Sequence, residues 1–188
     1  MTVLTLVRHG ETEENVAHIL QGHLPGHLTP RGIAQAEALR QQLAGEHFDV
    51  MLASDLRRAV DTALILAPAV GLTPELTPLL RERDWGSLTG HSIAGLDAHS
   101  FPPDVETVEA LFERARRFLL TVTVRYAGLS VLAVTHGLFA RVIRAAVTAK
   151  TIRDIPRMDN ATTCRLELAD TPVTNGTAQP EETGATAS

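Results

Sequence analysis

The chain has 188 residues, 44% of them hydrophobic and 21% charged, with a formal net charge of −5. This length suits one domain with a substantial core, and no apolar run reaches the roughly 20 residues that span a bilayer, so no membrane partner is expected. The acidic balance argues against nucleic acid as a partner, and the single cysteine, Cys164, excludes an internal disulfide. Because the first residues lack the pattern of a secretory signal, we expect a cytoplasmic location.

Hydrophobic periodicity predicts strands and helices that alternate along the chain. The predicted elements are, in chain order, a strand over 3–7 followed by a helix start, a helix from Thr29-Pro30 to Gly45, a strand over 49–53, a helix over 56–70, a helix from about 106 to before Gly128, a strand over 131–134, a helix over 138–147 and a strand over 162–168. Such alternation predicts an α/β fold, a three-layer sandwich in which helices flank a mainly parallel sheet. We expect residues 1–169 to form the domain and 170–188, which have few apolar side chains, to form a disordered tail.

The first candidate for chemistry is the triplet Arg8-His9-Gly10, where the first strand is expected to give way to a helix. An imidazole and a guanidinium near the free N–H groups of a helix start would place a nucleophile inside an anion site. The triplet alone is weak evidence, because a histidine that only caps a strand and an arginine in a surface ion pair would give the same sequence.

Three further clusters carry charged or titratable side chains. Arg57-Arg58 follows the second predicted strand, and His136 follows the third, where it repeats the arrangement around His9. Glu82 lies among arginines ahead of a glycine-containing loop. Because chemistry in open α/β sheets gathers at the carboxyl ends of strands, His9, His136 and one of the two arginines are predicted to meet there. The alternative interpretations are a surface arginine pair and a solvated run of charges.

Taken together, these clusters resemble the histidine phosphatase (phosphoglycerate mutase-like) superfamily over about residues 1–168. The signature blocks of that family resemble, in order, Arg8-His9-Gly10-Glu11-Thr12 with Asn15, Gln21-Gly22, Leu28-Thr29 with Gly32, Ser54-Asp55-Leu56 with Arg58-Ala59 and Thr62-Ala63, Glu82 with Gly86, and Thr135-His136-Gly137. An ordered set of this length is far more specific than any one block.

The resemblance implies a phosphatase that hydrolyses small phosphomonoesters through a covalent phosphohistidine on His9, with Glu82 as general acid and base. It implies a small phosphorylated metabolite as the substrate, and neither a cofactor nor a metal. The other residues implied at the catalytic centre or the phosphate pocket are His136, Arg8, Arg58, Asn15, Gly10, Gln21 and Gly22.

Elementary chemistry supports these roles. Arginine forks match phosphoryl oxygens and stay protonated, so Arg8 and Arg58 could neutralise a phosphomonoester without Mg²⁺. His9 can attack only as a neutral imidazole, with one nitrogen held by a backbone acceptor supplied after the strand. Glu82 would enter protonated, give its proton to the leaving oxygen and then take a proton from water.

Three alternatives remain open at this level. The first is that the same residues could return the phosphoryl group to a hydroxyl, as a phosphoglycerate mutase does. The short segment between Glu82 and His136 favours hydrolysis instead, because a small lid leaves the phosphohistidine accessible to water. A catalytically silent phosphate-binding protein is the second alternative. A metal site from His18, His23 and His27 is the third, although their spacing fits no tight ligand set. The sequence leaves the oligomeric state open, with a homodimer among the options.

Overall fold

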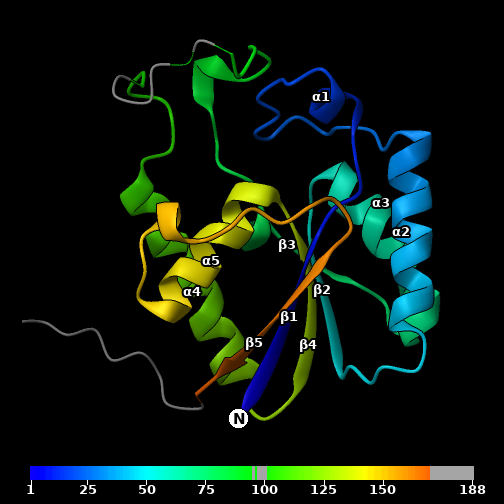
Figure 1. Ribbon diagram of the computed structural model, residues 1–188. Coiled ribbons are helices and arrows are strands. Elements are labelled where there is room, and N and C mark those ends of the chain that lie inside the picture. Colours follow the sequence, from blue (N-terminus) through cyan, green and yellow to red (C-terminus); the bar gives the residue numbers. More distant parts are fainter. Residues whose placement is uncertain (95, 97–100, 170–188) are drawn as a thin grey trace, which may run out of the picture.

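The computed structural model describes residues 1–94, 96 and 101–169, so the tail predicted from residue 170 onward lies outside the described residues. Its centre is a five-stranded sheet in the order β3-β2-β4-β1-β5 (Figure 1). The strands are β1 (Thr2–Arg8), β2 (Val50–Ser54), β3 (Glu75–Thr77), β4 (Ser130–Thr135) and β5 (Thr163–Leu168). The α-helices are α1 (Glu13–Val16), α2 (Pro30–Leu43), α3 (Arg57–Val70), α4 (Val108–Arg125) and α5 (Gly137–Thr148).

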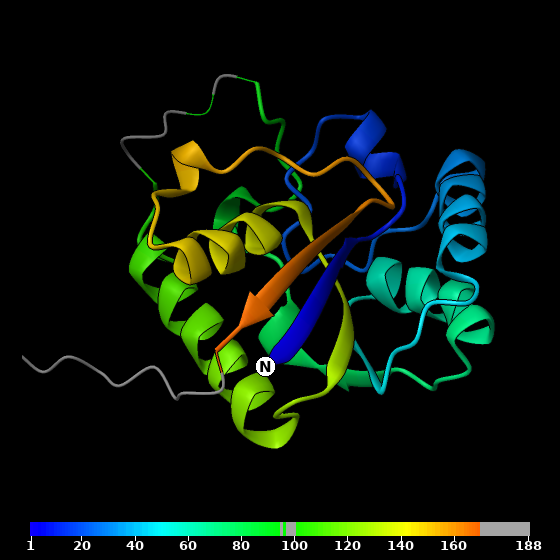
Figure 2. The same ribbon diagram turned by 60° about the horizontal axis from the view of Figure 1, so that its bottom comes forward.

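Helices cover both faces of the sheet, which confirms the predicted three-layer sandwich. Helices α2 and α3 pack on one face and α4 and α5 on the other, as Figures 1 and 2 show from two directions. Side chains on β4 alternate between the two cores: Val131 and Ala133 pack under α4 and α5, whereas Leu132 and Val134 pack under α2 and α3. This alternation follows from the two-residue period of a strand, and it explains why the strand reads as a continuous apolar run.

Three parallel strands end at the same edge of the sheet. Arg8 on β1 lies opposite Thr135 on β4, and Ala53 on β2 lies opposite Val134 on β4. Of the strands in the described ranges, only β5 runs antiparallel to its neighbour, which is β1. The residues that follow β1, β2 and β4 therefore come together at one carboxyl edge, which is where open α/β sheets bind ligands.

Most predicted elements are confirmed within a few residues. Thr29 caps α2 by accepting the N–H of Gly32, and Gly71 ends α3 in the left-handed conformation. Strand β3 was missed, because three residues between two prolines show no apolar alternation. The helix expected directly after β1 is reduced to the four residues of α1, which begins only after its cap, Thr12.

Among the helices of the described ranges, none combines the length and the apolarity that a membrane crossing requires.

Candidate active site

His9 starts the loop at the carboxyl end of β1, with 3% of its surface exposed. Its N–H donates to the carbonyl of Thr135 on β4 (3.0 Å), and its Nδ1 lies 2.7 Å from the carbonyl oxygen of Gly10. This carbonyl is the backbone acceptor expected from the sequence; it holds the ring proton on Nδ1 and leaves a lone pair on Nε2. Burial, followed by the charge of Arg58, lowers the pKa of His9 well below 6.5. The imidazole is therefore neutral at pH 7.

Gly10 fixes this geometry through its main chain. Its N–H donates to Oγ1 of Thr62 (3.1 Å), and a Cβ at this position would lie 2.5 Å from the carbonyl oxygen of Gly32. Gly10 does not line the pocket described below. Both of its main-chain groups are in use, so the structure gives it an orienting place behind His9 rather than the phosphate-binding place expected from the sequence.

The free N–H groups of a helix start, which were expected beside His9, are also absent. The N–H of Glu11 donates to Oε1 of Gln35 (3.0 Å), so the N–H groups of His9, Gly10 and Glu11 are all bonded within the protein. The idea of an anion cradle made by these N–H groups is wrong, and the positive charge at this edge comes from side chains instead.

His136 follows β4 and is fully buried. Its Nε2 lies 2.8 Å from Oγ of Ser54 at the end of β2, and Ser54 Oγ also accepts the N–H of Leu56 (3.3 Å). The hydroxyl hydrogen of Ser54 is therefore available to Nε2, which places the proton of a neutral ring on Nδ1. Burial and then Arg58 lower the pKa of His136 well below 6.5, so the ring is neutral. Its Nδ1 is buried without a partner among the described residues, and its ring centre lies 5.1 Å from that of His9.

Arg58 extends from the first turn of α3 and is 1% exposed. Its Nη1 donates to the carbonyl of Leu24 (2.5 Å) and its Nη2 to that of Gly22 (2.8 Å), while Nε has no partner in the described part of the chain. Burial lowers its pKa to about 10, so the group stays protonated at pH 7. A buried cation held only by carbonyl dipoles favours the arrival of an anion.

Arg8, at the end of β1, is a second cation of this kind. Its Nη1 donates to the carbonyl of Met158 (2.6 Å), and its Nε is buried without a partner among the described residues. Burial lowers its pKa, against the opposing effect of Glu82. Arg8 and Arg58 thus place two positive charges, neither in an ion pair with a described residue, beside the neutral ring of His9.

Glu82 lies at the amino end of α5. Its Oε1 accepts the N–H groups of Arg83 (2.9 Å) and Phe139 (3.1 Å), and its Oε2 accepts that of Leu138 (3.0 Å). The carboxyl group thus satisfies N–H groups that a helix start leaves unpaired. Because Oε2 accepts a single bond, it is the oxygen with room for a proton.

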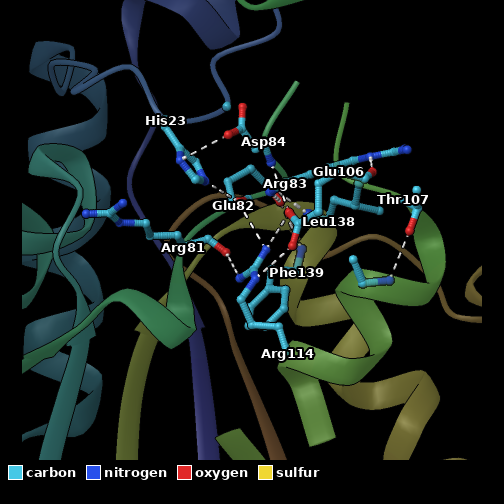
Figure 3. A network of polar contacts seen from close by, with 12 residues as sticks. His23, Arg81, Glu82, Arg83, Asp84, Glu106, Thr107, Arg114, Leu138 and Phe139 are labelled. Atoms are coloured by element: carbon cyan, nitrogen blue, oxygen red, sulfur yellow. Dashed lines mark hydrogen bonds and ion pairs between the residues drawn. The ribbon is translucent and has the colours of Figure 1, made fainter. Parts of the chain in front are cut away.

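Arg114 on α4 holds the loop that carries Glu82 (Figure 3). It donates to the carbonyls of Leu79 (3.2 Å), Arg81 (2.6 Å) and Glu82 (3.3 Å), and it pairs with Glu106 at 2.8 Å. Its guanidinium carbon also lies 4.0 Å from the ring centre of Phe139. One side chain therefore fixes the backbone before Glu82 relative to the helix that receives its carboxylate.

The remaining predicted residues frame the opening. Asn15 lines the pocket and is fixed by its Oδ1, which accepts from the N–H of Thr12 and from Nδ2 of Asn160. Gln21 and Gly22 also line the pocket. Oε1 of Gln21 is buried without a partner in the described part of the chain.

A pocket of about 520 Å³ lies at the carboxyl edge of the sheet; of the site residues predicted above, His136 and Gly10 do not line it, and neither does Arg114. Its inner wall holds Arg8, His9, Arg58 and Glu82, which confirms that the sequence clusters meet. The rest of the lining, which we call the outer wall, combines apolar side chains such as Trp85 and Phe101 with the arginines Arg83, Arg141, Arg153 and Arg157. Glu82 is the only carboxylate among the described lining residues.

Other charged residues considered from the sequence lie elsewhere. Arg57 pairs with Asp61 at 2.8 Å and Arg81 with Asp55 at 2.5 Å, and neither arginine lines the pocket. Nε2 of His23 lies 3.0 Å from the carbonyl oxygen of Glu82. Within the described ranges, no three His, Cys, Asp or Glu side chains are placed to hold a metal ion.

Sequence reasoning missed Arg114 and three arginines of the outer wall, Arg141, Arg153 and Arg157. Arg141 carried a signal, since it is a charged residue between the buried side chains of Ala140 and Val142. For the others the sequence offers no periodic or motif signal, because contacts between distant segments create their surroundings.

The fold and the site define an α/β protein with an anion pocket built from histidine and arginine, the arrangement of a phosphoryl-transfer enzyme. The chain belongs to the histidine phosphatase superfamily (branch 1), whose sequence profile matches residues 4–174.

Two relatives illustrate the similarity in sequence. An adenosylcobalamin/α-ribazole phosphatase of Escherichia coli is 33% identical over 147 residues, covering 71% of this chain and 72% of the relative. A metal-independent phosphoserine phosphatase of Arabidopsis thaliana is 34% identical over 166 residues, covering 79% and 69%. Among solved structures, the α-ribazole phosphatase of Shigella flexneri superposes with a TM-score of 0.80 at 27% identity, covering 89% of this chain and 91% of that one.

Proposed function

We propose that this protein is a phosphatase that hydrolyses small phosphomonoesters through a covalent phosphohistidine on His9. The observation that carries the proposal is the buried neutral imidazole of His9, oriented by a carbonyl and flanked by Arg8 and Arg58. The phosphatase names of both relatives support the reaction class. A cytoplasmic location, a possible homodimer and the absence of nucleic-acid partners stay predictions.

In the first step, the Nε2 lone pair of His9 attacks phosphorus while the bond from phosphorus to the ester oxygen breaks. Arg8 and Arg58 neutralise the phosphoryl oxygens, and the N–H of His136 Nδ1 donates to one of them. The proton on Oε2 of Glu82 passes to the leaving oxygen, so an alcohol departs rather than an alkoxide.

In the second step, water attacks the phosphorus of phosphohistidine. The carboxylate of Glu82 takes a proton from that water, the P–N bond breaks, and the electron pair returns to Nε2 of His9. Inorganic phosphate leaves, and both side chains are back in their starting protonation states.

The test is phosphate release from p-nitrophenyl phosphate in EDTA, combined with ³²P labelling. We expect activity in EDTA and an acid-labile, alkali-stable label, both abolished in His9→Ala. Because His9 is buried, His9→Gln, which keeps more of the volume, is the second variant, and melting temperatures verify folding. Substantial activity in either variant, or labelling elsewhere, would refute the phosphohistidine. Phosphoryl return to a substrate hydroxyl in place of phosphate release would instead identify a mutase.

A further inference from the structure

The outer wall of the pocket carries more positive charge than the phosphate site itself. Arg141 projects from α5, and Arg153 and Arg157 come from the segment that joins α5 to β5. We call these three the rim arginines. Arg153 and Arg157 are exposed and Arg141 is half-buried, and all three line the pocket. None of them forms an ion pair with any described residue.

Every described arginine that lines the pocket lacks a carboxylate partner, whereas most described arginines outside the pocket have one; the exceptions there are Arg117, Arg144 and Arg165. Arginines paired with an aspartate or glutamate all lie outside the pocket; they are Arg31, Arg40, Arg57, Arg81, Arg114, Arg116 and Arg125. In a chain with a net charge of −5, partners for surface arginines are plentiful. Asp154, in the same segment as Arg153, accepts from the N–H and the hydroxyl of Thr151 instead, so the rim arginines stay free for an anion from solution.

The rim is also fixed in place. Arg141 donates through Nε to the carbonyl of Ile155 (2.9 Å) and through Nη2 to that of Ile152 (2.6 Å), which leaves its Nη1 without a described partner. Arg8 donates to the carbonyl of Met158 in the same segment. Figure 1 shows this segment, in yellow-orange to orange, running from the end of α5 back across the sheet to β5. Two arginines thus fasten the segment that carries the rim over the catalytic residues.

Charge balance indicates what the rim can bind. A phosphomonoester dianion is matched by Arg8 and Arg58, so the rim charges are in excess of what the scissile group needs. Burial and then the charge of Arg157 lower the pKa of Arg141; Arg157 also lowers the pKa of Arg8, after burial and against the larger opposing effects of Glu82 and Asp159, so Arg157 is near enough to both arginines for mutual repulsion. A second anion between these cations would relieve that repulsion.

We propose that the rim arginines bind a second anionic group on the substrate, so that the preferred substrates are phosphomonoesters whose alcohol part carries a carboxylate or another phosphate. The inference rests on the proposed phosphatase function and narrows its substrate class. The planar guanidinium fork suits either group, and the two are separated by experiment.

The test compares substrates that differ only in the second anion. One pair is glycerol 3-phosphate and 3-phosphoglycerate, and the other is butane-1,4-diol monophosphate and its bisphosphate. The readout is the ratio of kcat/KM between the anionic and the neutral member of each pair. The variant is the double substitution Arg153→Gln with Arg157→Gln, and the control is Arg117→Gln, an exposed arginine on α4 that does not line the pocket.

We expect a ratio above one in the wild type that falls on the order of tenfold in the double variant, the effect of losing about 1.4 kcal/mol of binding. The substrate pair whose ratio falls further in the double variant shows whether the rim arginines bind a carboxylate or a phosphate. The control should keep the wild-type ratio. A ratio unchanged in the double variant overturns the rim proposal while leaving the phosphatase intact.

Failure of the phosphatase itself would be recognised separately. In that case p-nitrophenyl phosphate is not hydrolysed by the wild type. The rim is then tested without turnover, by calorimetric binding of the bisphosphate and the monophosphate to His9→Ala protein with and without the double substitution. Equal affinity for the two ligands in His9→Ala alone refutes the rim proposal.

Discussion

Replacing Glu82 by glutamine separates proton donation from a structural role. The substitution keeps Oε1, and with it the bonds from the N–H groups of Arg83 and Phe139. It replaces Oε2 by an amide NH₂ that faces the N–H of Leu138, so one acceptor becomes a donor opposite a donor. Leaving a partly buried N–H without its acceptor in this way lowers the free energy of unfolding by about 1–3 kcal/mol. At about 2–4 °C per kcal/mol for a chain of this size, the melting temperature should fall by roughly 2–12 °C.

A lower melting temperature is thus expected whichever role Glu82 has, and the deciding measurement is the dependence on the leaving group. If Glu82 protonates the departing oxygen, kcat/KM for alkyl phosphates should fall by about 10²–10⁴-fold, the usual effect of general acid catalysis. The loss for p-nitrophenyl phosphate should be much smaller, because its leaving group departs without a proton.

The matched control is Asp84→Asn, the same chemical change two residues along. Asp84 accepts the N–H of Gly86 and does not line the catalytic pocket. It should lose little activity on either substrate. Equal losses on alkyl and aryl phosphates in Glu82→Gln would refute its role as the acid, and a dependence on the leaving group in Asp84→Asn instead would transfer that role to Asp84.

Three further predictions concern the cations and the histidines. Arg58→Lys should lower kcat/KM on the order of 10²-fold or more, because an ammonium cannot replace two charge-assisted bonds. The control Arg57→Lys should lower kcat/KM only slightly, and equal losses in the two variants would refute the assignment of Arg58 to the phosphate pocket. Ser54→Ala should raise KM and the inhibition constant of phosphate several-fold with an unchanged leaving-group dependence, since the tautomer of His136 is no longer fixed; an unchanged KM would remove Ser54 from the site. The pKa values of His9 and His136 lie below 6.5 in the folded protein, so the unfolded chain binds more protons at these residues. The melting temperature should therefore decline as the pH falls below about 6.5, and this decline should be smaller in His136→Gln.

Sequence patterns predicted the layers and the inner site because both depend on local signals. Apolar runs place His9 and His136 directly after strands, and parallel strands with a shared edge bring such residues together. The role of Gly10 could not be predicted this way, since it depends on the close approach of Gly32, which is distant in sequence.

The parts that sequence reasoning missed are made by contacts across the fold. Glu82 was recognised, but its bonds to the start of α5 require the packing of two segments that are 56 residues apart. Arg114 reads as one more charge on an amphipathic helix until its acceptors are known. The rim arginines resemble ordinary surface charges in the sequence, and only the structure shows that they line the pocket.

The position of β1 in the sheet has a consequence for how the protein is made. This strand, which ends just before His9, is synthesised well before its neighbours β4 and β5, with which it pairs from Val3 to Ser130 and from Thr2 to Leu168. At about 5–20 residues per second, β1 waits roughly 6–26 s for β4 to be synthesised. During that time the apolar side chains of Leu4 and Leu6 have no sheet to pack in. The pocket at the carboxyl edge therefore assembles only after β4 is made, and until then the nascent chain exposes side chains that the folded protein buries.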